Sequence, residues 1–269
     1  QFDGHSHAGP GNWATTAVFS LIEGILLRPL PFKGPDRLVL LGDRLGDGPG
    51  TSITAREIGI YSNASSAFSS MGGYITATYE VSGRDTPEEV DGARLTTGAL
   101  ATLGVNPTLG RLFTQQEEDA HQPLAIISYA RWLNRYHRDP HILGSSITLD
   151  RKVYSIIGVM PRDFDFPVGN GLLDQTQLWV PLSLTADELS DEHAGFWGYH
   201  LVARLKDGVS LTQAGQDADR VAQQVMRTLP AGQSVIHIQG RVTPLLEYDV
   251  AEARPVLRTL FLSVMIVLL

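Results

Sequence analysis

The 269-residue chain contains no cysteine, so it has no disulfide framework, no thiolate metal site and no cysteine nucleophile. It also lacks an excess of basic residues, because 21 Lys and Arg stand against 29 Asp and Glu, a formal net charge of −8. Nucleic-acid-binding proteins cluster Lys and Arg against the phosphates. The composition therefore argues against nucleic acid as a partner. The absence of cysteine fits an oxidising compartment such as the periplasm, although many cytosolic chains lack it too.

The signatures of the common enzyme classes are also absent. The sequence has no Gly-x-Ser-x-Gly elbow, no His-Glu-x-x-His and no Walker sequence. The Gly- and Asp-rich stretch 42–52 is not a phosphate loop, because no Gly-Lys-Ser/Thr follows its glycines. We therefore expect no catalytic residue, no cofactor and no metal site, and we predict that the chain is not an enzyme.

One pair of carboxylates keeps a hydrolase hypothesis open. On one face of a strand, Asp163 and Asp165 would lie about 7 Å apart, a tolerable spacing for a general acid and base. Charges on a solvated strand edge are far more common, and replacing both residues by Asn in an activity screen would test the hypothesis. Glu88 and Glu89 form the only other close pair near a turn.

The histidines do not indicate a metal site. His5 and His7 have a spacing that can chelate on a strand, but no third ligand stands nearby in the sequence. Pro140 breaks the helix between His137 and His141, so these two do not form an i, i+4 pair. We predict that His137 and His141 are surface residues.

The sequence does contain enough apolar residues for a folded core, with 43% hydrophobic residues, 27 Gly and 15 Pro. This composition is typical of a turn-rich α/β or α+β protein. Both ends are unusually apolar, at 17–27 and 259–269. A bilayer span needs about 20 apolar residues, so each run looks like part of a span, with a buried C-terminal helix as the alternative for the second. The pattern predicts a polar domain between two membrane spans.

A central β unit organises the middle of the chain. The β-branched run 153–161 predicts a buried strand that ends at Pro161. We expect a hairpin with 146–149 and a return strand at 178–182. In the segment 162–167, charged and aromatic residues alternate, so Phe164 and Phe166 are predicted on one side and the two aspartates on the other.

Periodicity predicts further elements on either side of this unit. Strands are expected at 37–42, 71–82, 89–96, 124–128, 197–205 and 235–245. The strand at 89–96 is the expected antiparallel partner of the strand at 71–82. Helices are expected at 53–61, capped by Thr51 or Ser52, and at 100–104, 129–137 and 210–229. Trp132 and Tyr136 share one face of the third helix. Ser210 caps the last helix, whose predicted core stripe is Leu211, Ala214, Ala218, Val221, Ala222, Val225 and Leu229.

The order of these elements predicts how the ends of the domain meet. Strand, helix and strand within 197–245 form a split β-α-β unit, and 37–82 repeats it more loosely. We expect the two units to pack together around an inserted segment.

Several runs, taken in order, cover the chain from about residue 14 to its end, and they are Ala17–Phe32, Pro35–Val39, Leu103–Phe113, Ile127–Trp132, Asp139–Gly144, Ile157–Pro161, Phe164–Pro167, Leu178–Pro181 and Ala203–Ser210. Together these runs resemble the MacB/FtsX-like ABC transporter permeases, most closely the large acidobacterial-type permeases.

The resemblance implies an α+β periplasmic core domain with a porter-like lobe of β-α-β units and an inserted, mostly β Sabre-like lobe. It predicts these parts: an unmatched leader, 1–13; the end of the first membrane helix and its exit, 14–35; the porter-like lobe, 36–98 and 197–247; the Sabre-like lobe, 99–196; and the start of a second membrane helix, 248–269.

The resemblance also implies the function and the partners. A separate cytoplasmic ABC ATPase would hydrolyse ATP, and the membrane helices would transmit the movement to non-catalytic periplasmic lobes for export or efflux. The partners would be that ATPase, a second permease copy or half, a periplasmic adaptor and the inner membrane. The alternative is a free periplasmic binding or adaptor module whose apolar ends are core.

The sequence departs from this family at its ends. The family has a full first span before Ala14 and three more after residue 269, so we expect a permease truncated at both membrane-spanning ends. One hypothesis is a one-nucleotide frameshift in the codons for residues 1–13, which the gene sequence would test.

Overall fold

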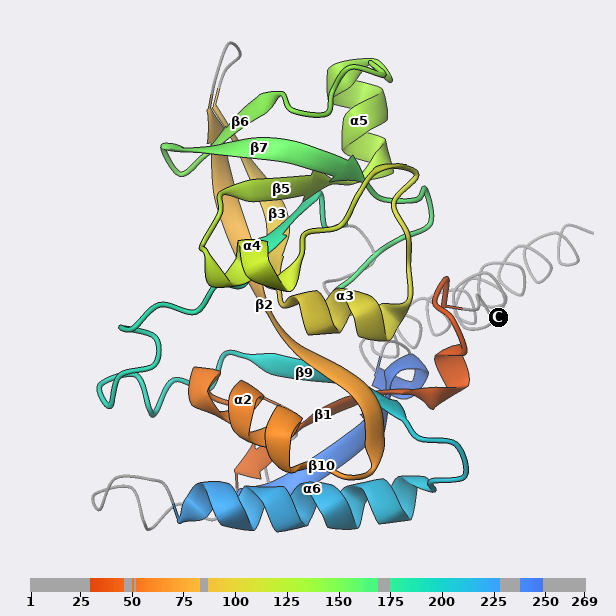
Figure 1. The fold of residues 1–269 in the computed structure, drawn as a ribbon, viewed down its shortest axis with the longest axis vertical. Helices are drawn as coiled ribbons and strands as arrows, with labels where there is room; N and C mark the ends of the chain where they lie inside the picture. The colour runs from red at the N-terminus through yellow and green to blue at the C-terminus, as the bar shows by residue number, and fades with distance from the viewer. Residues whose placement is uncertain are drawn as a thin grey trace, which may run out of the picture.

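The computed structural model describes residues 30–45, 50, 52–82, 87–168, 175–227 and 238–248. In this part of the chain a short 3-10 helix (Pro35–Arg37) is followed by strands β1 to β10 and helices α2 to α6, and residues 245–248 are helical as well. The strands form one mixed sheet in the order β10-β1-β9-β2-β3-β8-β5-β7-β4, with β6 beside β2 and β7 (Figure 1). The predicted α+β fold is confirmed.

The lower half of Figure 1 is a lobe of two interlocked β-α-β units, here called the β-α-β lobe. Its elements are β1 (Leu38–Leu45), α2 (Ala55–Ala64), the first half of β2 (Phe68–Ser82), β9 (His200–Leu205), α6 (Leu211–Met226) and β10 (Ile238–Pro244). Strands β9 and β10 both run antiparallel to β1, and β1 and β2 both run antiparallel to β9. The predicted split unit and its repeat therefore pair with each other, as expected.

The helices of this lobe begin at capping residues. Ser210 accepts a hydrogen bond from the N–H of Gln213 and starts α6, as predicted. The prediction that Thr51 or Ser52 caps α2 is wrong. Ser52 forms a β-bridge with Asp43, and Ile53 forms one with Tyr199, so the helix starts only at Ala55, with Thr54 as its N-cap.

The predicted core stripe of α6 needs one correction. Leu211 was predicted in the buried stripe but is 45% exposed, since it occupies the first turn of the helix. Asp217, which was not predicted there, is buried. The Asp217 carboxylate accepts hydrogen bonds from the N–H and Oγ of Ser66 and from the N–H of Ala67, which ties α6 to the start of β2.

The upper half of Figure 1 is here called the inserted lobe. Its elements are β3 (Glu88–Leu95), α3 (Thr97–Leu103), β4 (Leu109–Gly110), α4 (Gln115–Asp119), β5 (Leu124–Ile127), α5 (Tyr129–Tyr136), β6 (Ser146–Leu149), β7 (Lys152–Val159) and β8 (Leu178–Pro181). The predicted β6–β7 hairpin is confirmed. The predicted return strand exists as β8, but it pairs with β3 and β5 and not with β7. Strands β4, β5 and β6 already pair with β7.

Strand β2 connects the two lobes. Its first half pairs with β9, its second half pairs with β3, and its last two residues pair with β6. In Figure 1 it curves from the bottom of the molecule nearly to the top. The two lobes therefore share one continuous sheet. The lobe boundaries taken from the resemblance stay a prediction.

Both faces of the β-α-β lobe's sheet are buried, as alternation along β1 demonstrates. Val39 and Leu41 pack with residues of α2 and α6 on one face. Leu38 and Leu40 lie in a second cluster on the other face, with Leu103, Phe164, Phe166 and Trp179 of the inserted lobe. We call this second cluster the shared core, since both lobes contribute to it.

Some of the predictions lie outside the described residues. They include the apolar runs 17–27 and 259–269, the spacing of His5 and His7, and Leu229. Within the described ranges, no helix combines the length and the hydropathy that crossing a bilayer requires.

Candidate functional site

The first and last described segments of the chain meet in the shared core. Leu30 and Phe32, at the start, are 9% and 5% exposed, and Leu245, near the end, is fully buried in the same cluster. Tyr248 packs against the cluster as well. We call residues 30–37 the entry segment and 245–248 the exit segment. A force applied to either one acts directly on the core that joins the lobes.

Aromatic rings fill this meeting point. The Phe32 ring lies edge-on to Phe164 and Phe166, with centroid distances of 6.0 and 6.2 Å. Phe166 also contacts Tyr74 at 4.8 Å, and Phe164 contacts Trp179 at 5.0 Å. Each such pair adds about 0.5–1.5 kcal/mol beyond the buried area. The entry segment is therefore held by rings of the inserted lobe.

The segment that carries two of these rings is not the strand that its pattern predicted. The N–H of Phe164 donates to the carbonyl of Pro161, which closes a turn, and the residues after it are irregular. The predicted sidedness is still correct, because Phe164 and Phe166 are buried while Asp163 is exposed and Asp165 half-buried. The 7 Å spacing behind the hydrolase hypothesis presupposed a strand, so it does not apply.

A single arginine joins the entry segment to both lobes. Arg204 of β9 donates from Nη1 to the carbonyl oxygen of Gly34 at 3.0 Å, and from Nη2 and Nε to that of Thr102 at 2.7 and 3.2 Å. Gly34 has a φ of 53°, a conformation that favours glycine. The N–H of Lys33 also donates to the carbonyl of Leu103 at 3.3 Å. The entry segment thus contacts β9 and α3 at once.

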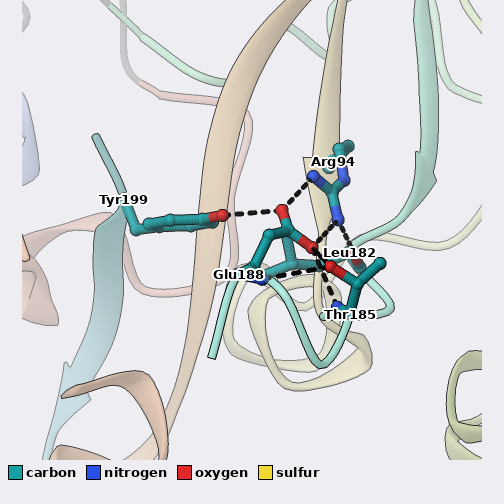
Figure 2. Close-up of polar contacts among 5 residues, drawn as sticks. All are labelled: Arg94, Leu182, Thr185, Glu188 and Tyr199. Carbon is teal, nitrogen blue, oxygen red and sulfur yellow. Dashed lines mark hydrogen bonds and ion pairs between the residues drawn. The ribbon is translucent and has the colours of Figure 1, made fainter. Parts of the chain in front are cut away.

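A second polar connection, the Glu188 cluster, lies where the inserted lobe returns to β9 (Figure 2). Arg94 of β3 donates from Nη1 and Nη2 to the two carboxylate oxygens of Glu188, at 2.6 and 3.2 Å, and to the carbonyl of Leu182. The hydroxyl of Tyr199 donates to Glu188 Oε1 at 2.7 Å. Thr185 donates its N–H and its hydroxyl to Oε2. One carboxylate therefore ties together β3, the loop after β8 and the residue before β9.

Glu188 and Arg94 each favour the charged form of the other, and this shifts both pKa values. Partial burial of Glu188 opposes its ionisation, but the hydrogen bonds from Arg94, Thr185 and Tyr199 outweigh burial and lower its pKa to about 2. Burial likewise opposes the charge on Arg94, whose pKa is nevertheless raised by the Glu188 carboxylate. The side chains of Arg94 and Glu188 are 26% and 18% exposed, which limits screening by solvent.

We expect acid to open this cluster. The pKa of Glu188 is lowered from 4.5 to about 2, so its contribution is complete above pH 4.5 and is lost as the pH falls toward 2. Glu188→Gln should remove this acid dependence and lower the free energy of unfolding at pH 7 by about 1–2 kcal/mol. Urea unfolding between pH 2 and 7 measures both effects. Glu192→Gln, in the same loop but exposed, is the control, and identical pH profiles for the two variants would contradict the assignment.

The other residues that the sequence singled out have structural roles. Glu88 accepts hydrogen bonds from Arg131 at 2.8 Å and from Arg135, and these outweigh burial and lower its pKa. Its carboxylate fastens α5 to β3. His137 and His141 are exposed, as predicted. Over the described residues, no group of three His, Asp or Glu side chains is arranged to hold a metal ion.

Sequence reasoning missed the residues that make the two polar connections. The Thr185-x-x-Glu188 spacing matches a capping box and could have indicated Glu188. Arg94 and Arg204 carry no local signal, because the groups they bind lie 88 to 170 residues away in the sequence. The contact of Tyr199 with Glu188 carries none either, because it depends on how the strands pair.

The fold defines a class of mixed α+β domains in which two lobes share one sheet. Residues 11–221 match the model of the MacB-like periplasmic core domain family. The chain belongs to that family. A comparison with curated protein sequences gives no match.

Three solved structures share the fold. The extracellular domain of the noncanonic ABC-type transporter YknZ from Gram-positive bacteria is 14% identical, with a TM-score of 0.53, and the match covers 77% of this chain and 99% of that chain. A domain of a putative permease protein from Porphyromonas gingivalis is 15% identical, with a TM-score of 0.57 and coverages of 79% and 92%. The periplasmic region of MacB from Actinobacillus actinomycetemcomitans is 13% identical, with a TM-score of 0.53 and coverages of 83% and 93%.

Proposed function

We propose that this chain is the periplasmic core domain of an inner-membrane ABC transporter permease, and that it couples ATP hydrolysis in the cytoplasm to movement of its two lobes during export or efflux. The partners would be a separate cytoplasmic ATPase, a second permease copy or half, and a periplasmic adaptor. The domain itself would be non-catalytic. Family membership supports the class, and the periplasmic domain of MacB has the same fold.

One observation carries the coupling proposal. The entry and exit segments pack into the core that joins the lobes, with Phe32 against Phe164 and Phe166, and Leu245 in the same cluster. The predicted membrane helices lie immediately before and after these segments in the sequence. A shift of either helix would therefore move buried groups of both lobes, because a packed interior transmits displacement. We further propose that the porter-like lobe comprises residues 36–98 and 197–247 and the Sabre-like lobe residues 99–196, a division that assigns β3, here described with the inserted lobe, to the porter-like lobe.

Spin labels on the two lobes test this coupling. Because the chain has no cysteine, the double variant Leu143→Cys and Leu211→Cys takes labels at two exposed positions only, one on each lobe. We expect the inter-label distance distribution, measured by pulsed electron resonance in membranes that contain the permease and its ATPase, to change when ATP is added.

The matched control places both labels on α6. Gln216→Cys and Gln223→Cys are exposed positions on one rigid helix, so their distance should not respond to ATP. An unchanged distance between the two lobes would reject the coupling and favour the free periplasmic module. Extraction of the protein from membranes also distinguishes the permease domain from the free periplasmic module, since a permease domain with its membrane segments should need detergent.

A further inference from the structure

Two carboxylates are buried where α2 packs on β1. Asp43 of β1 is 0% exposed and Glu57 of α2 is 1% exposed. Tyr61 donates its hydroxyl to Asp43 Oδ1, and the N–H of Thr54 donates to Glu57 Oε2 at 2.6 Å. The second oxygens, Asp43 Oδ2 and Glu57 Oε1, are buried without a hydrogen-bond partner. A charged carboxylate is costly in such a place unless it is paired.

The charged and titratable groups that face this pair do not supply a positive charge. Tyr61 of α2 and Asp219 of α6 face Asp43, and Asp43 itself acts on Glu57. On α6, Arg220 binds Asp217 and the carbonyl of Ala64. Arg44 and Arg241 lie on the opposite face of the sheet by strand alternation, since β1 pairs Gly42 with Arg241. The neighbours are therefore neutral or acidic.

We propose that Asp43 and Glu57 form a proton-binding site, which retains a proton while α2 is packed on the sheet and releases α2 when that proton leaves for the solvent. With the proton bound, one carboxyl group of the pair is neutral and its O–H is available to the unpartnered oxygens. With the proton lost, two negative charges share an interior that water does not reach. Separation of α2 from β1 then relieves the repulsion.

Electrostatics agrees with this geometry. Burial raises the pKa of Asp43 to about 7, and burial together with the charge of Asp43 raises the pKa of Glu57 to about 8. Both values lie above the ordinary 3.8 and 4.5. The stability contributed by the pair is therefore complete below these ordinary values, and it is lost as the pH rises through about 7 to 8.

Movement of α2 would reach the inserted lobe through the Glu188 cluster and the loop that carries it. Ile53, which precedes α2, exchanges backbone hydrogen bonds with Tyr199 at 2.7 and 3.1 Å. Arg56 of α2 donates to the carbonyl of Leu189 and pairs with Asp191 at 2.7 Å. The proton site thus regulates the loop that returns the inserted lobe to β9.

Hydrogen exchange of the full chain in a mild detergent tests the proposal. After correction for the intrinsic rate, the protection factors of the α2 amides should fall by up to about tenfold per pH unit between pH 7 and 9 if one proton is released. Asp43→Asn and Glu57→Gln should each flatten this profile. Glu89→Gln, which removes an exposed carboxylate, should keep the wild-type profile.

A carbon-13 NMR titration of the wild-type carboxyl groups gives a second readout that does not require the variants to fold. It should place the midpoint of at least one of the two groups above pH 6. Midpoints near 4 for both groups, or wild-type pH profiles in Asp43→Asn and Glu57→Gln, would overturn the proposal. A rise in Tm on adding calcium or sodium chloride that needs both carboxylates would also overturn it, since the site would then bind a cation.

Discussion

Replacing Gly72 by alanine should lower the free energy of unfolding by at least about 3 kcal/mol, the upper end for overpacking. A Cβ at this position would lie 1.9 Å from the backbone nitrogen of Ala99, 2.4 Å from the carbonyl carbon of Gly98 and 2.5 Å from Thr96 Oγ1. Two of these are backbone atoms, so no side-chain rotation relieves the clash. The start of α3 must move away from β2.

The displacement should also reach the entry segment, because α3 provides the Thr102 and Leu103 carbonyls that bind Arg204 and Lys33. Urea unfolding measures the loss of stability. Gly59→Ala is the matched control: this glycine is exposed in α2 with nothing within 4 Å of the added Cβ, so the change should stabilise by about 0.5–1 kcal/mol. A Gly72→Ala protein within about 1 kcal/mol of wild type would contradict the close approach of β2 and α3.

Truncating Trp179 should cost about 3–5 kcal/mol, as expected for a large aromatic residue in a core. This side chain is 0% exposed, packs against Phe164 and donates from Nε1 to the carbonyl of Phe166 at 2.6 Å. Trp179→Ala leaves a cavity in the shared core and an unpaired carbonyl. Both defects lie beside Phe166, whose ring packs against Phe32.

Two further variants separate the causes of this loss. Trp179→Phe keeps most of the ring but removes the hydrogen bond, so it should cost about 1–3 kcal/mol. Phe196→Ala removes a ring that is 50% exposed, and we expect a loss below about 1 kcal/mol. Denaturant unfolding gives all three values. A loss for Phe196→Ala equal to that for Trp179→Ala would refute the assignment of Trp179 to the shared core.

Local patterns were sufficient for most helices and strands. The hairpin of β6 and β7, the antiparallel pair of β2 and β3, and α6 after Ser210 all follow from alternation, helical period and caps. Such signals involve residues a few positions apart. The errors occur where a distant residue competes, as at Ser52 and Ile53, whose β-bridges delay the start of α2.

The candidate site depended on long-range pairing. The order of motifs along the chain was enough to indicate the permease family, which the match over residues 11–221 confirmed. It could not indicate Arg94 or Arg204 as connecting residues, because an exposed arginine and a partnered one look alike in sequence.

The sequence by itself determined most of the elements, the two β-α-β units and the family, since each rests on residues that are near neighbours or on motifs in a fixed order. Only the tertiary structure decided that β8 pairs with β3 and β5, that Phe32 and Leu245 enter one core, and that Asp43 and Glu57 are buried together. The physical reason is that burial and pairing are properties of the folded chain, in which residues 102 to 170 positions apart, such as Arg204 and its partners, come into contact.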